Sequence, residues 1–207
     1  MAPDRVRLTR FHPLHRLGNW PWWWRSWVAL LVLGLAAHAP AEAWEASGTQ
    51  TITAHTRDGG RVQLGTVRFD PQPDGWSTFQ IRMTPGLLKD HFLSMKEFKC
   101  LEGDGEIACH VPYPYAHPAR VNAQNLGWLE HQLLFLYKLP SDFGAKLWNG
   151  LYFQLNVTPT GLRGQAQAID LNHISVPPSP LDIPPYAAQL RDDIQPNPRW
   201  IQSLSIE

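Results

Sequence analysis

Residues 92–115 read FLSMKEFKCLEGDGEIACHVPYPY and contain both cysteines of the chain. Asp104-Gly105 is a preferred centre for a type I′ turn, because both residues tolerate the positive φ that this turn requires. A hairpin around the turn sets Cys100 opposite Cys109 in a non-hydrogen-bonded pair, where Cα atoms approach to about 4.5 Å. A disulfide accepts Cα separations of about 4.4–6.8 Å. The stretch therefore predicts a cross-strand Cys100–Cys109 disulfide.

The two faces of this hairpin differ in polarity. The apolar face is expected to pack on the core and carries Phe98, Cys100, Ile107, Cys109 and Val111. The other face carries Glu97, Lys99, Glu106 and His110. The alternative to a disulfide is a pair of reduced, buried cysteines that pack as small hydrophobic residues. The oxidising compartment indicated by the N-terminus favours the disulfide.

The N-terminal segment has the three parts of a secretory signal peptide. Residues 1–25 hold five arginines and one aspartate, and residues 27–37 are an apolar run of eleven. Ala41-Glu42-Ala43 then has the small-x-small pattern of a signal-peptidase site, which makes Trp44 the first mature residue. The apolar run is shorter than the roughly 20 residues that a spanning helix needs. We expect a signal peptide over 1–43 and a periplasmic or secreted protein; the alternative is an uncleaved membrane anchor, which the tryptophans of the basic region would suit.

Length and charge constrain the mature part of the chain. The chain has 207 residues with 18 basic and 18 acidic side chains, and removing residues 1–43 leaves 13 basic and 16 acidic ones, a net charge of −3. A mildly acidic surface without basic clusters argues against nucleic-acid binding. We expect a β-rich globular domain over 44–176. Residues 177–207 should form a proline-rich wrap, with a possible edge strand from Trp200.

Apolar residues recur with the period of strands over most of this domain. The strands are expected over 49–56, 61–70, 76–83, 147–157 and 162–171, together with the two arms of the disulfide hairpin. In the second strand the apolar positions change parity at Gly65, which predicts a β-bulge there. Leucines spaced by three and four residues predict one helix over 122–139, ended by Pro140.

These elements predict a mainly β fold. Three hairpins and one helix suggest an antiparallel barrel or a strongly curved sheet with one covering α-helix. The small residues Gly164, Ala166 and Ala168 lie opposite a bulky strand, as in the interior of a curved sheet. The alternative is a two-layer α+β sandwich.

Motifs that would carry chemistry are absent from the sequence. The histidines form no H-x-x-x-H or H-E-x-x-H pair, and no serine stands in a G-x-S-x-G setting. Glu97, Glu130 and Asp170 are the acids embedded in apolar or aromatic stretches. Glu130 and His131 are adjacent on the expected helix, where neighbours point about 100° apart, so we do not expect them to face one site. No catalytic residue, metal ligand or cofactor is assigned.

Amphipathic aromatic residues are the remaining signal, because such side chains commonly line ligand grooves. The candidate binding residues are His110, Tyr113, Tyr115, His117, Trp148 and Tyr152. Ordinary core and rim positions would also explain them.

Three functions remain open at this point. The first is a non-enzymatic binding domain for a small apolar ligand, a peptide or an envelope protein. The second is an envelope hydrolase that uses His110 or His131 with Glu130 or Asp170. The third is a membrane-tethered accessory protein, which requires that residues 1–43 stay uncleaved.

Three stretches carry a resemblance: MKEFKCLEGDGEIACHVPYPY (95–115), NLGWLEHQLLFLYKLP (125–140) and LWNGLYFQL (147–155). With them, residues 92–178 resemble a group of uncharacterised secreted proteins of Gram-negative bacteria. The resemblance implies periplasmic residence and one domain. It implies no activity, ligand or catalytic residue.

Overall fold

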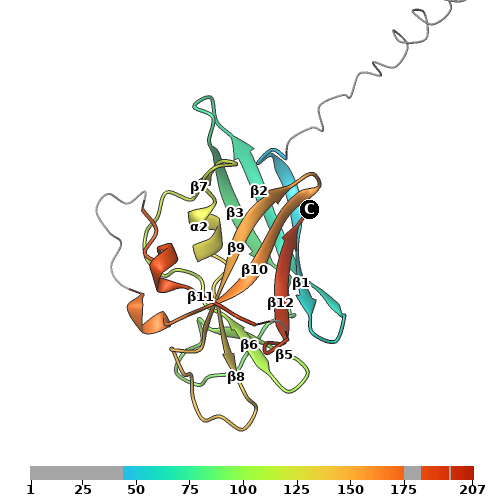
Figure 1. Ribbon diagram of the computed structural model, residues 1–207, viewed down its shortest axis with the longest axis vertical. Coiled ribbons are helices and arrows are strands. Elements are labelled where there is room, and N and C mark those ends of the chain that lie inside the picture. Colours follow the sequence, from blue (N-terminus) through green and yellow to red (C-terminus); the bar gives the residue numbers. More distant parts are fainter. Residues whose placement is uncertain (1–43, 175–182, 196) are drawn as a thin grey trace, which may run out of the picture. The chain divides into compact units, whose positions relative to one another are not determined.

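Twelve β-strands form the framework of the part of the chain that the structure describes, which is residues 44–174, 183–195 and 197–207 of a computed structural model (Figure 1). The predicted signal peptide, 1–43, lies outside the described residues. The strands are β1 (Gly48–Thr56), β2 (Arg61–Pro71), β3 (Ser77–Met83), β4 (Lys89–Asp90), β5 (Lys99–Glu102), β6 (Ile107–His110), β7 (Arg120–Val121), β8 (Phe135–Lys138), β9 (Gly150–Thr158), β10 (Gly161–Ile169), β11 (Asp192–Asp193) and β12 (Ile201–Ile206). The helix α2 spans Gly127–His131, and 3₁₀ turns span Leu171–His173 and Ala188–Leu190.

The strands form one antiparallel sheet with the order β4-β5-β6-β8-β9-β10-β12-β1-β2-β3-β7, and β11 pairs with β10. The edge strands of this path are β4 and β7, and among the described residues they do not pair with each other. The mainly β prediction is therefore confirmed. The prediction allowed either a closed barrel or a strongly curved sheet. The described strands form the open, curved sheet and do not close into a barrel.

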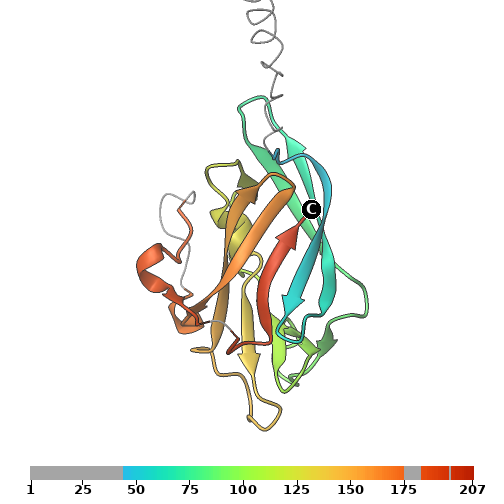
Figure 2. The same cartoon turned by 45° about the vertical axis from the view of Figure 1, so that its right-hand side comes forward.

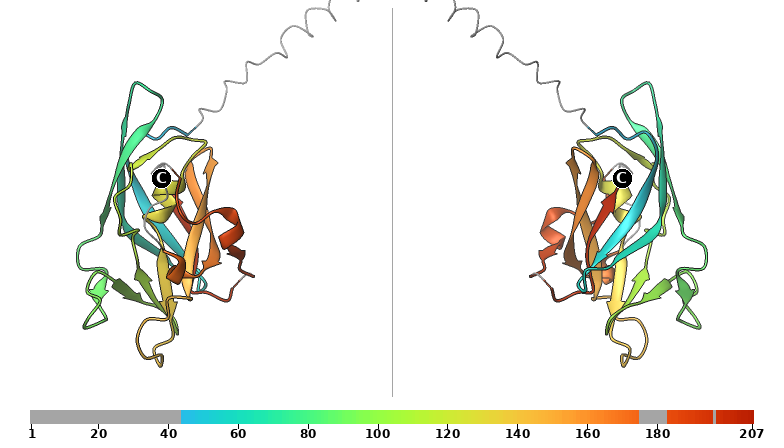
Figure 3. Two further views of the ribbon diagram at one scale, coloured as in Figure 1. Left: turned by 90° about the vertical axis from the view of Figure 1, so that its left-hand side faces the viewer. Right: turned by 90° about the vertical axis from the view of Figure 1, so that its right-hand side faces the viewer.

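The sheet curves around α2. Strands β3 and β9 are five positions apart in the sheet order, which would separate them by about 24 Å if the sheet were flat. Side chains from both strands nevertheless belong to one buried cluster with Trp128 and Leu129 of α2. Figures 2 and 3 show α2 enclosed between the β2–β3 and β9–β10 sides of the sheet. In the described residues no helix is long and apolar enough to cross a membrane.

The strands β6 and β8, and the first part of β9 (residues 150–153), are largely buried on both faces. Ala108, Phe135 and Phe153 point into the main core inside the curve. Cys109 and Tyr152, from the opposite faces, belong to a second apolar cluster on the outer side. The hairpin prediction was thus incomplete: its apolar face packs as expected, but Glu106 and His110 on the other face are buried too.

The predicted register of the disulfide hairpin is confirmed. Cys100 lies opposite Cys109 and the two sulfurs are bonded. The turn contacts the C-terminal part of the chain: a Cβ at Gly103 would lie 2.1 Å from Cδ2 of Trp200. Glu106 also accepts a hydrogen bond from the Trp200 backbone N–H (3.1 Å) and pairs with Arg199 (3.1 Å). The hairpin therefore fixes the entry into β12.

The predicted helix over 122–139 was wrong in extent. Only Gly127–His131 is α-helical, and Phe135–Lys138 is β8, paired with β6 and β9. The run Leu133–Tyr137 is apolar at every position, so it fits the period of a helix and that of a strand buried on both faces. Pairing with the disulfide hairpin decides in favour of the strand.

The C-terminal strand was expected at an edge, and it lies instead in the middle of the sheet. β12 pairs with β10 on one side and with β1 on the other. All four residues Ser203–Ile206 are buried. Within β2, the predicted bulge is confirmed, because the β1–β2 register skips one residue next to Gly65. A Cβ at Gly65 would lie 2.3 Å from the carbonyl oxygen of Arg82.

Candidate functional site

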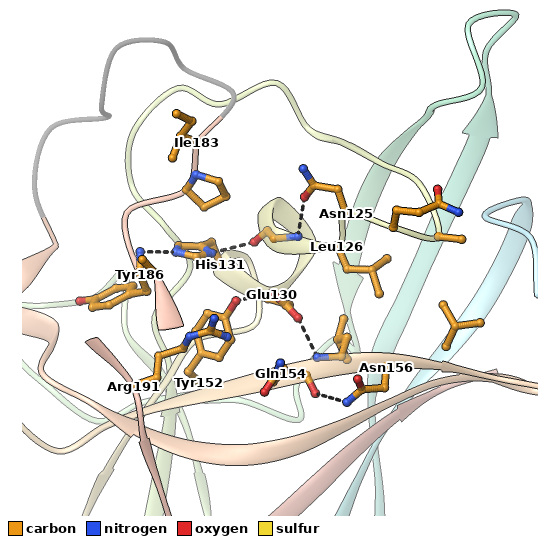
Figure 4. A pocket seen from close by; sticks show the side chains of 17 residues that line it. Asn125, Leu126, Glu130, His131, Tyr152, Gln154, Asn156, Ile183, Tyr186 and Arg191 are labelled. Atoms are coloured by element: carbon orange, nitrogen blue, oxygen red, sulfur yellow. Dashed lines mark hydrogen bonds between the residues drawn. The ribbon is translucent and has the colours of Figure 1, made fainter. Parts of the chain in front are cut away.

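A cleft of about 530 Å³ lies between α2, β9 and the segment 183–191 (Figure 4). We call it the α2 cleft. Its walls combine apolar, amide and charged side chains, which belong to Ala123, Gln124, Asn125, Leu126, Glu130, His131, Tyr152, Gln154, Leu155, Asn156, Val157, Ile183, Pro184, Tyr186, Ala187 and Arg191. Its volume falls within the range of about 300–1,000 Å³ that is usual for small-molecule sites.

Glu130 anchors the cleft to β9. One carboxylate oxygen accepts a hydrogen bond from the Leu155 backbone N–H (2.7 Å) and the other accepts one from the Tyr152 hydroxyl. Burial raises the pKa of Glu130, an effect that these two hydrogen bonds and the charge of Arg191 partly offset. The carboxyl is therefore fixed in place by its partners on β9.

His131 ties the C-terminal segment to α2. Its Nδ1 donates a hydrogen bond to the Gly127 carbonyl (2.7 Å), and its Nε2 accepts one from the Tyr186 backbone N–H (3.0 Å). These partners define a neutral imidazole with the proton on Nδ1. Burial lowers the pKa of His131 to about 4, which agrees with this neutral form. Its ring also stacks on Tyr186 and meets Tyr152 edge-on.

Arg191 supplies the positive charge of the cleft. Its guanidinium carbon lies 4.5 Å from the centroid of the Tyr152 ring, in a cation–π arrangement. Its Nε is buried and has no hydrogen-bond partner among the described residues. No carboxylate of the described residues lies within salt-bridge distance of it, and it is the only Lys or Arg of the cleft lining. The guanidinium can therefore accept an anionic partner.

The rim of the cleft carries side-chain amides. Gln154 and Asn156 point outward from β9, and Asn125 precedes α2, where its side-chain oxygen accepts a hydrogen bond from Gly127 N (3.2 Å). Figure 4 shows these amides on the side of the cleft away from Tyr186. Amides donate and accept, so they match the N–H and C=O groups of a ligand.

The structure brings only one of the six candidate binding residues, Tyr152, into the α2 cleft. Tyr113 lines a separate, mainly apolar cavity of about 570 Å³ with Phe98, Val111 and Leu147. His110 is buried: its Nε2 donates to the Gln132 carbonyl (2.8 Å), and burial lowers its pKa.

The other three candidates lie elsewhere. His117 is stacked between Phe79 and Trp128, with ring centroids 6.2 and 5.4 Å away. Tyr115 is exposed and meets Tyr113 edge-on. Trp148 is exposed on the loop between β8 and β9 and lines neither cavity.

Sequence reasoning missed several residues of the α2 cleft. It treated Glu130 and His131 as facing apart, but both contact Tyr152. The expectation failed because β9 and the 183–191 segment enclose this short helix from two sides. No sequence pattern pointed to Arg191 as a binding residue, because it lies in a proline-rich segment far from β9 in the sequence. Tyr186 was not among the candidate binding residues.

The histidines and Asp170, which were candidates for hydrolase chemistry, form hydrogen bonds that hold the backbone in place. Both nitrogens of His131 and one of His110 bond to backbone groups. Asp170 caps the 3₁₀ turn by accepting from the Asn172 backbone N–H (2.8 Å). Among the described residues no three His, Cys, Asp or Glu side chains gather as metal ligands would. The geometry gives no support to the hydrolase alternative.

The fold and the cleft define a mainly β domain with one small-molecule-sized site beside its helix. Comparison of the chain with protein-family models, with curated proteins and with solved structures finds no match.

Proposed function

We propose that this protein is a non-catalytic binding domain of the bacterial periplasm whose ligand occupies the α2 cleft. The unpaired guanidinium of Arg191, held against Tyr152, is the observation that carries this proposal. A guanidinium binds a carboxylate through two parallel hydrogen bonds, which adds geometric specificity to the charge.

The ligand that fits best is a short peptide or a similar amide-bearing acid. Its carboxylate would pair with Arg191, its amides would meet Gln154 and Asn156, and a small apolar group would contact Leu126. The lining is too polar for a purely apolar ligand, so within the binding function we favour the peptide over the other partners.

The location belongs to the same proposal. The basic and apolar segments before Ala43 support export, and the Cys100–Cys109 disulfide is typical of oxidising compartments. Membership in the group of Gram-negative secreted proteins and cleavage before Trp44 stay predictions. N-terminal sequencing of the exported protein checks the cleavage, and an uncleaved start at Met1 would support the membrane-tethered alternative.

The binding test compares acetyl-Ala-Ala with its C-terminal amide as probes, by NMR or calorimetry on the purified protein. We expect the acid to bind at least about tenfold more tightly, because the amide cannot form the charged pair with Arg191. Arg191→Gln should abolish this difference, whereas Arg163→Gln, which removes an exposed arginine on β10, should preserve it. Equal binding of acid and amide, or no binding of either, would refute the proposal.

A further inference from the structure

The loop that connects β8 to β9, residues 139–149, projects beyond the ends of its strands (Figures 1 and 3). We call it the β8–β9 loop. It holds a bulky apolar side chain that is wholly exposed, Phe143, at 100%. Trp148 and Leu139 of the same loop are 62% and 49% exposed. Neither cavity described above uses these three side chains.

A second loop, 91–98 between β4 and β5, lies beside the first. The ring centroid of Phe92, in this loop, lies 5.6 Å from Nζ of Lys138 at the end of β8. Glu97 and Phe98 line the same cavity as Leu147. This second loop carries Leu93, which is 98% exposed. Four of the eight exposed large hydrophobic residues of the described chain thus lie on two adjacent loops.

The lysines of the chain gather at the same place. All five, namely Lys89, Lys96, Lys99, Lys138 and Lys146, lie within or next to the two loops. The loops and their flanking residues, 89–99 and 138–149, contain three acidic residues and therefore have a net charge of +2, whereas the chain from Trp44 onward has −3. Lys99 and Lys146 pair with Asp90 and Asp142, and Lys138 is buried. Lys89 and Lys96 are exposed and have no salt bridge to any described residue.

We propose that these two loops dock the protein on the surface of an anionic lipid bilayer. Exposed apolar side chains on a projecting loop suit a fluid surface that they can enter, and tryptophan is enriched at the level of the lipid headgroups. Lysines near the surface of an anionic leaflet add electrostatic attraction to the lipid phosphates. Phe143 and Trp148 enter the headgroup region, while Lys89 and Lys96 face the lipid phosphates. This docking does not depend on a ligand in the α2 cleft.

The test places an environment-sensitive fluorophore, NBD, on the β8–β9 loop of the full chain. Both native cysteines are in the disulfide, so Ser141→Cys gives a single labelling site. The control site is Thr160→Cys in the β9–β10 turn, at the other end of a nine-residue strand. The apolar segment within residues 1–43 could itself bind lipid. The fluorophore reports only on the surroundings of its own loop, so this segment can be present in every sample.

We expect NBD at position 141, but not at 160, to gain intensity and shift to the blue with vesicles of phosphatidylglycerol mixed with phosphatidylcholine. Phe143→Ser with Trp148→Ser should weaken the lipid response at least about tenfold, since two apolar side chains lose their burial. Lys89→Gln with Lys96→Gln should weaken it by about thirtyfold, and the control pair Arg68→Gln with Arg163→Gln should leave it unchanged.

Three results would overturn the proposal. The first is no response at position 141 to either vesicle, which would point to a protein partner for these loops. The second is an equal response at positions 141 and 160. The third is an equal response to vesicles of phosphatidylcholine alone, which would remove the role of the lysines.

Discussion

Glu130 shows how a single buried carboxyl organises the α2 cleft. Its two oxygens accept hydrogen bonds from the Tyr152 hydroxyl and from the Leu155 backbone. Burial raises its pKa, so the folded protein holds the proton more tightly than the unfolded chain does. The contribution of Glu130 to stability is therefore largest at low pH and falls as pH rises through the raised pKa.

Two substitutions at Glu130 separate charge from hydrogen bonding. Glu130→Gln removes the charge and should stabilise the protein relative to wild type increasingly as pH rises from the ordinary carboxyl pKa of 4.5 to the raised pKa of Glu130. Glu130→Ala leaves the Tyr152 hydroxyl and the Leu155 N–H without their acceptor and should cost about 2 kcal/mol. Urea unfolding at several pH values measures both. A pH-independent difference between wild type and Glu130→Gln would contradict the raised pKa.

His131 has the opposite pH dependence. Its pKa falls from 6.5 to about 4 on folding, so between these values the unfolded chain binds more protons. Stability from His131 is therefore complete above pH 6.5 and is lost as pH falls toward 4, with a slope of up to about 1.4 kcal/mol per pH unit. His131→Gln should remove this slope, while His173→Gln, at an exposed position, should retain it. Parallel pH profiles for wild type and His131→Gln, from urea unfolding, would contradict the prediction.

At the scale of elements, the disulfide hairpin is a structural clamp. Its register followed from the Asp104-Gly105 turn alone, because a two-residue turn determines every cross-strand pair beyond it. The contacts of that turn with Arg199 and Trp200 could not be predicted, since they join residues about 95 positions apart in the chain.

Removal of the disulfide tests this clamp. Cys100→Ala with Cys109→Ala should lower the free energy of unfolding by about 2.5–3 kcal/mol, because a short loop is no longer closed in the unfolded chain. Denaturant unfolding of wild type and of the double variant gives the difference. The single variant Gly105→Ala is a useful comparison, because it strains a turn residue with φ +68° while it leaves the disulfide intact. An unchanged unfolding free energy in the double variant would show that the bond contributes nothing.

The β8 segment shows where sequence periodicity fails. When every residue of a short run is apolar, the helical period and the strand period fit equally well. The residue pattern of β9, by contrast, alternates in polarity and was predicted with its facing small residues: Phe153 lies opposite Ala166, and Leu155 opposite Gly164. Alternation identifies a strand only where one of its faces differs from the other.

At the scale of the whole molecule, the position of β12 decides how the sheet holds together. An edge strand contributes one set of backbone pairs, whereas β12 joins β10 to β1 and so connects the two halves of the sheet. The Cα partners of its Leu204 are Ala54 and Gly164. The last residues of the chain are therefore central to the fold.

A truncation tests this assignment. A chain that ends at Pro198 should fail to form the cooperative sheet, because two strand edges and the apolar faces of Ile201, Leu204 and Ile206 lose their partners. Far-UV circular dichroism and thermal unfolding measure the loss, and a chain that lacks only Glu207 serves as the control. A truncated chain that unfolds at nearly the wild-type temperature would mean that β12 acts as a dispensable edge.

The sequence by itself determined the local features: the disulfide pair, the bulge at Gly65, the hairpin of β9 and β10 and the mainly β class. Each depends on turn chemistry or on a two-residue period, which act between near neighbours in the chain. Only the tertiary structure decided the strand order, the central place of β12, the nature of β8 and the α2 cleft. The cleft joins Glu130 and Tyr152 to Arg191, and residues 91–98 and 138–149 meet through Phe92 and Lys138. Such contacts depend on how the sheet curves, and the curvature is set by packing around α2 that no local pattern encodes.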